Sequence, residues 1–474
     1  MTDQPDRTIG VALSGGGHRA TVFGLGALLA LCDHGLHRRV TSISSVSGGS
    51  IANGIAMVDL DYGTTTPEAF EAHLAPRLSV IAHRGLLLGN APATARYIQL
   101  LIGAVALAIV SLVVLVASAL FRWRAPVVVA LVVLVLSLLA LWTLVRKRSE
   151  RTERAADREL FGNANVTLSS LASRSVHHVI CTTELQSGEP FYLSPRMVHG
   201  YRFGHGKPGQ VRLATAVQAS ACVPGAFNPR VIPTDDMALS LDSGINQVIL
   251  NDGGTYDNMA DQWEYGFAGR ATNDRSPWPA LTDVQPPAKF LLIVNASKGW
   301  ENLNPITLRG RNLELAGLLR SQGVQYDGTT AHRRQALYRD FVEAERTGRG
   351  ATGSFAQIGR SPYRPIRDFA YWKGDGAPTA EWRVRHARAQ AAAEFLAAQG
   401  YQEKAWEQTT SANASVKTTL ARLNAKAAKA AKNVNVTADL LEHGYLSTIV
   451  NLHVLHDLVP LVPFDRERFL RLCQ

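Results

Sequence analysis

The sequence predicts an α/β fold in which helices cover a largely parallel central sheet and a transmembrane helical hairpin is inserted into the chain. Two strand–turn–helix units follow one another near the N-terminus, a pattern typical of parallel sheets. Two uncharged apolar stretches come next, and further strand-like segments appear only beyond them. The sheet is therefore expected to continue after the insertion, with strands near Val176 to Thr182 and at Phe191 to Leu193. Further along the chain, alanine-rich helices are expected around Ala387 to Ala398 and through Ala421 to Lys432.

The first unit combines a short apolar strand with a glycine-rich turn and a helix. Ile9 to Ser14 is predicted to be a buried strand, and an apolar helix is expected from Ala20 to about His34. Between them lies the run Gly15-Gly16-Gly17. Backbone amides in such a loop are free of side-chain obstruction and can point at an anion, helped by the helix N-terminus. An oxyanion hole requires backbone amides arranged in this way.

Two other interpretations of this glycine run stay open. It can allow close packing of helix on sheet, or it can bind a nucleotide, because Gly15-x-Gly17-x-x-Ala20 loosely matches a dinucleotide fingerprint. That fingerprint needs an acidic residue at the end of the second strand, where this chain has Ser44 and Ser45. A Gly-Lys-Ser/Thr phosphate loop is also missing from the sequence, which disfavours nucleotide binding.

The second unit has a serine at its turn. A strand is expected from Val40 to Ser44, then the turn Ser47-Gly48-Gly49, then a helix. A nucleophile elbow needs this context, because small neighbours permit the strained turn that exposes a serine hydroxyl. Ser47 is therefore the candidate nucleophile. The glycine usual two places earlier is Ser45 here, and a Ser-Gly turn also occurs in plain βα connections.

A carboxylate follows a later strand. Ile249 to Asn251 leads into Asp252-Gly253-Gly254, which predicts Asp252 at the carboxyl edge of the sheet, where α/β sites collect. An Asp-Gly pair is commonly only a turn, but with the exposed serine and the amide-rich loop it supplies nucleophile, base and anion stabiliser together. Phe290 to Asn295 is a further apolar strand, and both of these strands are expected at the centre of the sheet.

The two apolar stretches are long enough to cross a bilayer. At the helical rise, Ile98 to Phe121 and Val127 to Val145 each span roughly 30 Å. Only five residues separate them, so they are expected to form a hairpin. Basic residues are more numerous at its outer ends than at its tip, namely Arg96, Arg146, Lys147, Arg148, Arg151 and Arg154 against Arg122 and Arg124. The positive-inside rule then predicts that both termini are cytoplasmic. Two buried core helices are the alternative.

Composition limits the classes of function. The formal net charge of +10 is compatible with an anionic lipid surface, with nucleic acid or with simple solubility, and the charge alone does not choose among them. The basic residues are scattered without an aromatic stripe, so no nucleic-acid binding is expected. The four cysteines lack metal-type spacing, which argues against a zinc site and against a disulfide framework. No signal pattern occurs at the N-terminus, so the catalytic part is expected in the cytoplasm.

Four short blocks occur in order along the chain. They are Ser14-Gly15-Gly16-Gly17-His18-Arg19-Ala20, the Ser-Val-Ser47-Gly-Gly-Ser turn, Ala219-Ser220-Ala221-Cys222-Val223-Pro224 with Phe227 and Pro229, and Asp252-Gly253-Gly254 with Asp257-Asn258. In these blocks the chain resembles the patatin-like phospholipase family, which implies a three-layer α/β/α domain. We expect residues 1–95 and 149–300 to form it, residues 96–148 to be the inserted hairpin, and the basic, helix-rich residues 301–474 to pack on or extend it.

The resemblance also implies a site and a reaction. In that family a Ser-Asp dyad works without histidine, so Ser47 would attack a lipid ester carbonyl and Asp252 would take its proton. The amides of Gly15-Gly16-Gly17 would hold the oxyanion, and Arg19 would orient the loop or meet a lipid phosphate. No metal or cofactor is needed for this scheme. The expected partners are a lipid ester and the bilayer, and the formation of a homo-oligomer is left open.

Three alternatives for the whole chain stay open. A Ser-His-Asp triad is compatible with the order of residues, because His443, His453 and His456 follow Ser47 and Asp252. Ser47 nevertheless comes after only the second predicted strand, earlier than the elbow of an α/β-hydrolase, so these histidines are expected to be structural. A catalytically silent membrane scaffold is the second alternative, and a nucleotide-binding oxidoreductase is the third.

Overall fold

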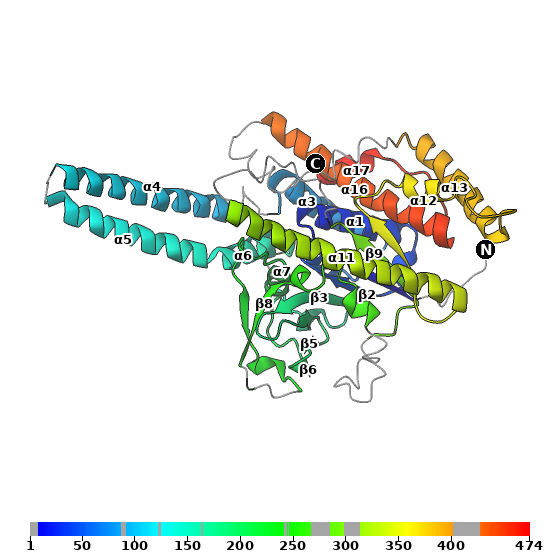
Figure 1. The fold of residues 1–474 in the computed structure, drawn as a ribbon, viewed down its shortest axis with the longest axis horizontal. Helices are drawn as coiled ribbons and strands as arrows, with labels where there is room; N and C mark the ends of the chain where they lie inside the picture. Colours follow the sequence, from blue (N-terminus) through cyan, green and yellow to red (C-terminus); the bar gives the residue numbers. More distant parts are fainter. Residues whose placement is uncertain are drawn as a thin grey trace.

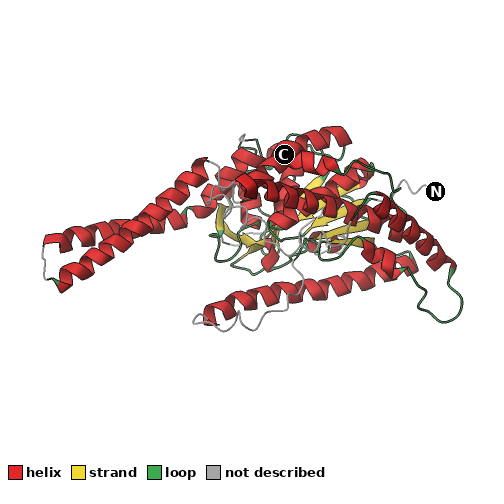
Figure 2. Cartoon of the chain, turned by 90° about the horizontal axis from the view of Figure 1, so that it is seen from above, coloured by secondary structure: helices red, strands yellow, loops and turns green. Residues whose placement is uncertain are grey.

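One mixed sheet runs through the body of the protein, and a pair of long helices projects from this body (Figure 1). The computed structural model describes residues 8–86, 92–121, 125–162, 165–240, 244, 246–266, 285–297, 313–401 and 427–474. Helices cover the two faces of the sheet unequally, with most of them gathered on one side (Figure 2).

The centre of the sheet is parallel, as predicted. Its strands are, in order, β10 (Thr352–Gln357), β9 (Phe290–Asn295), β1 (Ile9–Leu13), β2 (Val40–Ser45) and β3 (His177–Glu184). Every residue of β1, β3 and β9 is buried, as expected of apolar strands covered on both faces. The strands expected near residues 9–14, 40–44, 176–182 and 290–295 are thereby confirmed.

The other half of the sheet is antiparallel. Beyond β3 it continues through β4 (Pro190–Leu193), β5 (Val198–Gly200) and β6 (Gly204–Gly206), while β7 (Arg230–Pro233) pairs with β8 (Gln247–Asp252). The strand before Asp252, expected at the centre of the sheet, is β8, which lies between β3 and β7 and pairs antiparallel with the second half of β3. The other expected central strand, β9, does lie between β1 and β10.

Two helical layers of unequal size flank the sheet. The larger core cluster joins it to α1 (His18–Asp33), α2 (Gly48–Met57), α3 (Pro67–Arg84), α7 (Leu213–Ser220), α13 (Ala380–Ala398), α16 (Ala427–His456) and α17 (Glu467–Cys473). The smaller cluster, on the opposite face, contains Trp263 of α8 (Gln262–Tyr265) and Phe341 of α11 (Leu313–Thr347). The chain after residue 312 thus completes the core of the sheet.

Helix α16 lies directly against α1. The ring of His443 is 5.3 Å from that of Phe23, and the hydroxyl of Tyr445 donates a hydrogen bond of 2.9 Å to Asp33. The helix predicted near residues 387–398 is confirmed as the end of α13. Of the helix predicted over 421–432, the part before residue 427 lies outside the described residues.

Helices α4 (Pro92–Leu120) and α5 (Ala125–Arg146) form the projecting pair (Figure 1). Their segments Arg96–Leu120 and Pro126–Arg146 are long and apolar enough to span a membrane. Only 11% of each is buried against the rest of the chain, so the alternative of two core helices does not fit. The tip residues Arg122, Trp123 and Arg124 lie outside the described residues.

Candidate active site

Ser47 occupies the tight turn between β2 and α2. Its backbone angles are φ 52° and ψ −118°, a conformation that strains any residue with a side chain. The neighbouring Gly48 is required by close contact, because a Cβ at this position would lie 2.2 Å from the carbonyl oxygen of Gly17. The turn has the geometry of a nucleophile elbow and rests directly on the glycine-rich loop.

Strands β2 and β8 bring Ser47 and Asp252 together from opposite directions. Along β3, Ser45 at the end of β2 pairs with Ile180, and Asp252 at the end of β8 pairs with Thr182. The side chain of Ser47 stabilises the charged carboxylate of Asp252, and this carboxylate accepts the N–H of Gly254 at 2.8 Å. Two strand ends that are remote in sequence therefore meet beside one residue of β3.

The environment of Asp252 makes it a stronger base than an exposed aspartate. Burial raises the pKa of its carboxyl from 3.8 to about 6, because removal of water destabilises the charged form. The hydrogen bonds from Gly254 and Ser47 partly oppose this rise, because they stabilise the carboxylate. At pH 7 the group is mostly ionised and still accepts a proton more readily than an ordinary aspartate.

The amides of the glycine-rich loop are not equivalent. The N–H of Gly15 donates to the carbonyl of Asn258 at 2.9 Å, so it is already engaged. For Gly16 and Gly17, no acceptor is found in the part of the chain that the structure describes. The expected set of three donors is thus reduced to two. The amide of Gly48, first residue of α2, was not predicted from the sequence, although the residue after an elbow serine commonly donates to an oxyanion.

Two helix N-termini meet at this loop. Helix α1 begins at His18 and α2 at Gly48, and their starts are in contact through Gly17. The positive ends of both helix dipoles therefore favour negative charge here. Arg19 lies in the first turn of α1 and is half-buried.

Ser45, which replaces the usual glycine, belongs to a buried polar network beneath the elbow. Its hydroxyl donates to the carbonyl of Val179 at 3.1 Å and accepts hydrogen bonds from Ser50 and Asn53 of α2. Ser220 of α7 accepts the backbone N–H of Ser47 at 3.0 Å. The side chain at position 45 is thus accommodated within the fold. The hydrogen bond from Ser47 to Ser220 supports the turn, and this role of Ser220 was not predicted from the sequence.

The histidines of the alternative triad lie elsewhere. Nε2 of His443 is 3.0 Å from the carbonyl of Ile358, and Nδ1 of His453 is 2.9 Å from that of Val459. Nδ1 of His456 lies 3.6 Å from Glu345. These partners belong to the C-terminal layer and not to the elbow, so a Ser-His-Asp triad with these histidines does not fit the structure.

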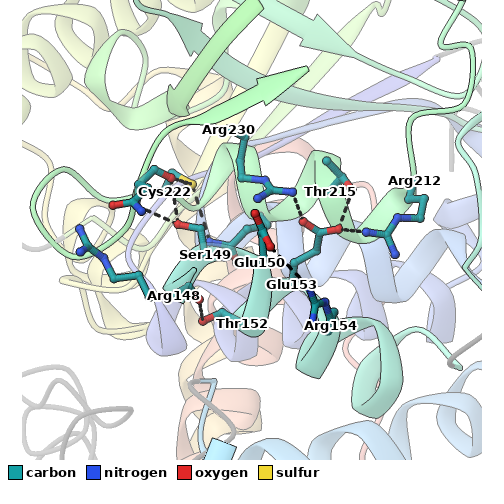
Figure 3. A network of polar contacts seen from close by, with 12 residues as sticks. Arg148, Ser149, Glu150, Thr152, Glu153, Arg154, Arg212, Thr215, Cys222 and Arg230 are labelled. Atoms are coloured by element: carbon teal, nitrogen blue, oxygen red, sulfur yellow. Dashed lines mark hydrogen bonds and ion pairs between the residues drawn. The ribbon is translucent and has the colours of Figure 1, made fainter. Parts of the chain in front are cut away.

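Helix α6 (Arg148–Leu160) connects the projecting helices to the site (Figure 3). The hydroxyl of Ser149 donates to the carbonyl of Asn228 at 2.9 Å and accepts the N–H of the same residue at 2.8 Å. Cys222 donates to that carbonyl as well, and its own carbonyl accepts the N–H of Asp252 at 3.3 Å. A short series of hydrogen bonds thus joins the base of the hairpin to the carboxylate-bearing residue.

A buried glutamate holds α6 in place. Glu153 is 1% exposed and forms ion pairs with both Arg212 and Arg230, while Thr215 donates to it at 2.8 Å (Figure 3). Removing one partner of a buried ion pair leaves an uncompensated charge and costs several kcal/mol, about 3–5 in measured cases. This cluster therefore fixes α6 against α7 and β7.

Comparison with known proteins gives a family match over the part of the chain that carries the site. The family model of patatin-like phospholipases matches residues 11–260, and no curated protein matches the chain. A human GIVD cytosolic phospholipase A2 in complex with methyl gamma-linolenyl fluorophosphonate and terbium chloride is 19% identical, with a TM-score of 0.24 over 41% of this chain and 24% of that one.

Two further structures are similar over longer stretches. A second structure of human GIVD cytosolic phospholipase A2 is 15% identical, with a TM-score of 0.34 over 65% of this chain and 45% of that one. VipD from Legionella pneumophila is 15% identical, with a TM-score of 0.25 over 99% and 90%. The chain therefore spans less than half the length of the two human chains.

Proposed function

The chain belongs to the patatin-like phospholipase family, and from this premise we propose that it is a membrane-anchored serine hydrolase of lipid carboxylic esters. Ser47 acts as the nucleophile and Asp252 as the base. The observation that carries the proposal is that the two strand ends bearing these residues meet at β3, which brings the two side chains together next to the glycine-rich loop at the start of α1.

In the first half-reaction, Ser47 Oγ attacks the carbonyl carbon of the ester and its proton passes to the carboxylate of Asp252. The carbonyl oxygen becomes an oxyanion, which accepts hydrogen bonds from the amides of Gly16, Gly17 and Gly48. Each such donor typically contributes about 3 kcal/mol to transition-state stabilisation. Collapse of the intermediate breaks the ester bond, and the leaving alcohol takes the proton from Asp252. The acyl group is now on Ser47.

In the second half-reaction, Asp252 takes a proton from water, and the resulting hydroxide attacks the acyl carbon. The same amides hold the second oxyanion. When the bond to Ser47 Oγ breaks, the proton returns from Asp252 to the serine and the fatty acid leaves. Atoms and charges balance with no metal or cofactor in the cycle, and Asp252 moves one proton in each half.

Labelling with a fluorophosphonate probe tests the nucleophile, because such probes react with activated serines. Ser47→Ala should lose the label and all hydrolysis of p-nitrophenyl esters, while circular dichroism stays unchanged. The matched control is Ser170→Ala, which alters an exposed serine and should keep both signals. Retained labelling of the Ser47 variant would reject the assignment. A folded, unmodified protein that never labels in native membranes would instead favour the silent scaffold.

The anchoring part of the proposal rests on α4 and α5. Their apolar side chains are largely exposed, and Val113 and Leu136 are 61% and 59% accessible. Two adjacent helices with this much exposed apolar surface suit the hydrocarbon core of a bilayer. We propose that the hairpin spans the membrane with the catalytic body and both termini on the cytoplasmic side, as the excess of arginine and lysine at its outer ends predicts.

A further inference from the structure

A cavity of about 960 Å³ lies at the outer edge of β10. Its walls come from α11, α12 (Tyr363–Asp368), α13 and α16, and none of its lining residues belongs to the dyad, the glycine-rich loop or the segment contacted by α6. In the described sheet β10 is a terminal strand, so this side of it is not paired with another strand. Helices α12 and α13 lie at the end of the body remote from the hairpin (Figure 1).

Positive charge is in excess around this cavity. Five arginines line it against two carboxylates, and the members are Arg334, Arg339, Arg360, Arg364 and Arg385 with Glu345 and Asp368. The carboxylates are already engaged, since Asp368 pairs with Arg364 and Glu345 pairs with Arg385, both at 3.2 Å. Among the described residues, Arg334, Arg339 and Arg360 have no carboxylate partner. The arginines and carboxylates of the lining therefore carry a net positive charge of three, because five arginines face two carboxylates.

Arginines this close repel one another. The pKa of Arg360 is lowered first by burial and then by the charges of Arg334 and Arg364. An anion placed beside Arg334 and Arg360 would reduce this repulsion and would receive charge-assisted hydrogen bonds, for which the planar guanidinium is well suited.

The floor of the cavity carries two buried hydroxyls that make no hydrogen bond. Ser354 of β10 and Ser447 of α16 are 3% and 1% exposed, and no partner for either Oγ is found among the described residues. Buried polar groups are nearly always satisfied, so an unpaired pair in one cavity points to an absent acceptor or donor. Apolar side chains, including Phe341, Phe355 and Leu455, line another part of the wall, which also carries uncharged polar side chains.

We propose that this cavity binds an anionic amphiphile, a molecule that carries a phosphate or carboxylate group on an apolar body. Arg334 and Arg360 bind the negative group, and the serine hydroxyls bind its oxygen atoms. The apolar body packs on the phenylalanines. The volume lies within the range of about 300–1,000 Å³ that is usual for small-molecule sites. The site is separate from Ser47, so the proposal does not depend on the proposed hydrolase activity.

Isothermal titration calorimetry on the full-length protein in a nonionic detergent tests this directly, with detergent-only titrations subtracted. Four probes separate the two parts of the ligand: hexyl phosphate, hexanoate, inorganic phosphate and hexanol. We expect hexyl phosphate or hexanoate to bind at least tenfold more tightly than both inorganic phosphate and hexanol, and the better of the two identifies the anionic group. Equal affinity for hexanol, equal affinity for inorganic phosphate, or no binding by any probe would overturn the proposal.

Two variants tie the binding to the cavity. Arg360→Ala should weaken the better probe at least tenfold, and its melting temperature without ligand should not fall, because a repelling charge is removed. Arg383→Ala is the matched control, since Arg383 is exposed on α13 two positions before Arg385 and so faces away from the cavity. If Arg360→Ala does not fold, Arg334→Gln replaces it. Unchanged affinity in the cavity variant, or an equal loss in the control, contradicts the assignment.

Discussion

Replacing Asp252 with Asn should strongly lower the rate of hydrolysis and at the same time stabilise the folded protein at neutral pH. Burial raises the pKa of this carboxyl from 3.8 to about 6. At about 1.4 kcal/mol for each tenfold change in proton affinity, ionised Asp252 costs the folded state about 3 kcal/mol. Asn is uncharged at every pH, and its side-chain oxygen can still accept the N–H of Gly254. Loss of the base should lower kcat by roughly 10²- to 10⁴-fold.

The pH dependence gives this prediction its sign. The carboxyl of Asp252 binds its proton more tightly in the folded state than in the unfolded state. The favourable contribution of this proton to the free energy of unfolding is therefore fully present below pH 3.8 and is lost as the pH rises to about 6. The variant should therefore unfold with a free energy about 3 kcal/mol higher above pH 7, and this advantage should shrink below pH 6 and nearly vanish near pH 4.

Denaturant unfolding followed by tryptophan fluorescence between pH 4 and 8 measures this difference. Asp235→Asn serves as the control, because Asp235 is exposed and the same substitution there should change little at any pH. If the Asp252 variant is no more stable than the native chain at pH 7.5, or if its advantage is the same at pH 4, burial does not raise the pKa and the reasoning fails.

Three further predictions follow from the same structure. The value of kcat/KM for a soluble ester should fall below about pH 6, since protonated Asp252 cannot act as a base, and a profile that falls only near pH 4 would contradict a buried base. Gly48→Ala should destabilise the protein by roughly 1–3 kcal/mol, because its Cβ would lie 2.2 Å from a carbonyl oxygen, whereas Gly317→Ala in open space on α11 should be harmless or stabilising in the same melting experiment. The double substitution Val113→Asp and Leu136→Asp should release the chain from carbonate-washed membranes, because each charge at the bilayer centre costs roughly 2.5–3.5 kcal/mol of insertion free energy. Full retention of this variant would argue against a spanning hairpin.

Features set by local chemistry were predictable from the sequence. The Gly15-Gly16-Gly17 run and the Ser47 turn each lie between an apolar strand and an apolar helix, and the structure has both turns at these positions. The pairing of Ser47 with Asp252 was inferred from the family resemblance, because no local pattern connects residues so far apart. In the structure β2 and β8 end opposite Ile180 and Thr182 of β3, which brings the two residues together.

Features set by tertiary contacts were not predictable. The direction of β8 depends on β2 ending opposite Ile180, which leaves the second half of β3 open to a strand from the other side. The amide of Gly15 differs from its two neighbours only because Asn258 reaches it from a distant loop. The arginines of the cavity are distributed over four elements, so no spacing in the sequence indicates that they gather at β10.

The position of the hairpin in the chain bears on how a lipid would reach the dyad. Helix α6 follows α5 directly, and its Ser149 is hydrogen-bonded to Asn228. Asn228 accepts a hydrogen bond from Cys222, whose carbonyl in turn accepts the backbone N–H of Asp252. The same loop exposes 45% of Val223, an apolar side chain beside the base of the hairpin. Arg148, at the start of α6, donates to the carbonyl of Gly225 in this loop, so the loop lies beside the base of the hairpin. Under the proposed function, a hairpin that spans a bilayer would therefore hold the sheet edge that carries Asp252 near the membrane as well as tether the chain.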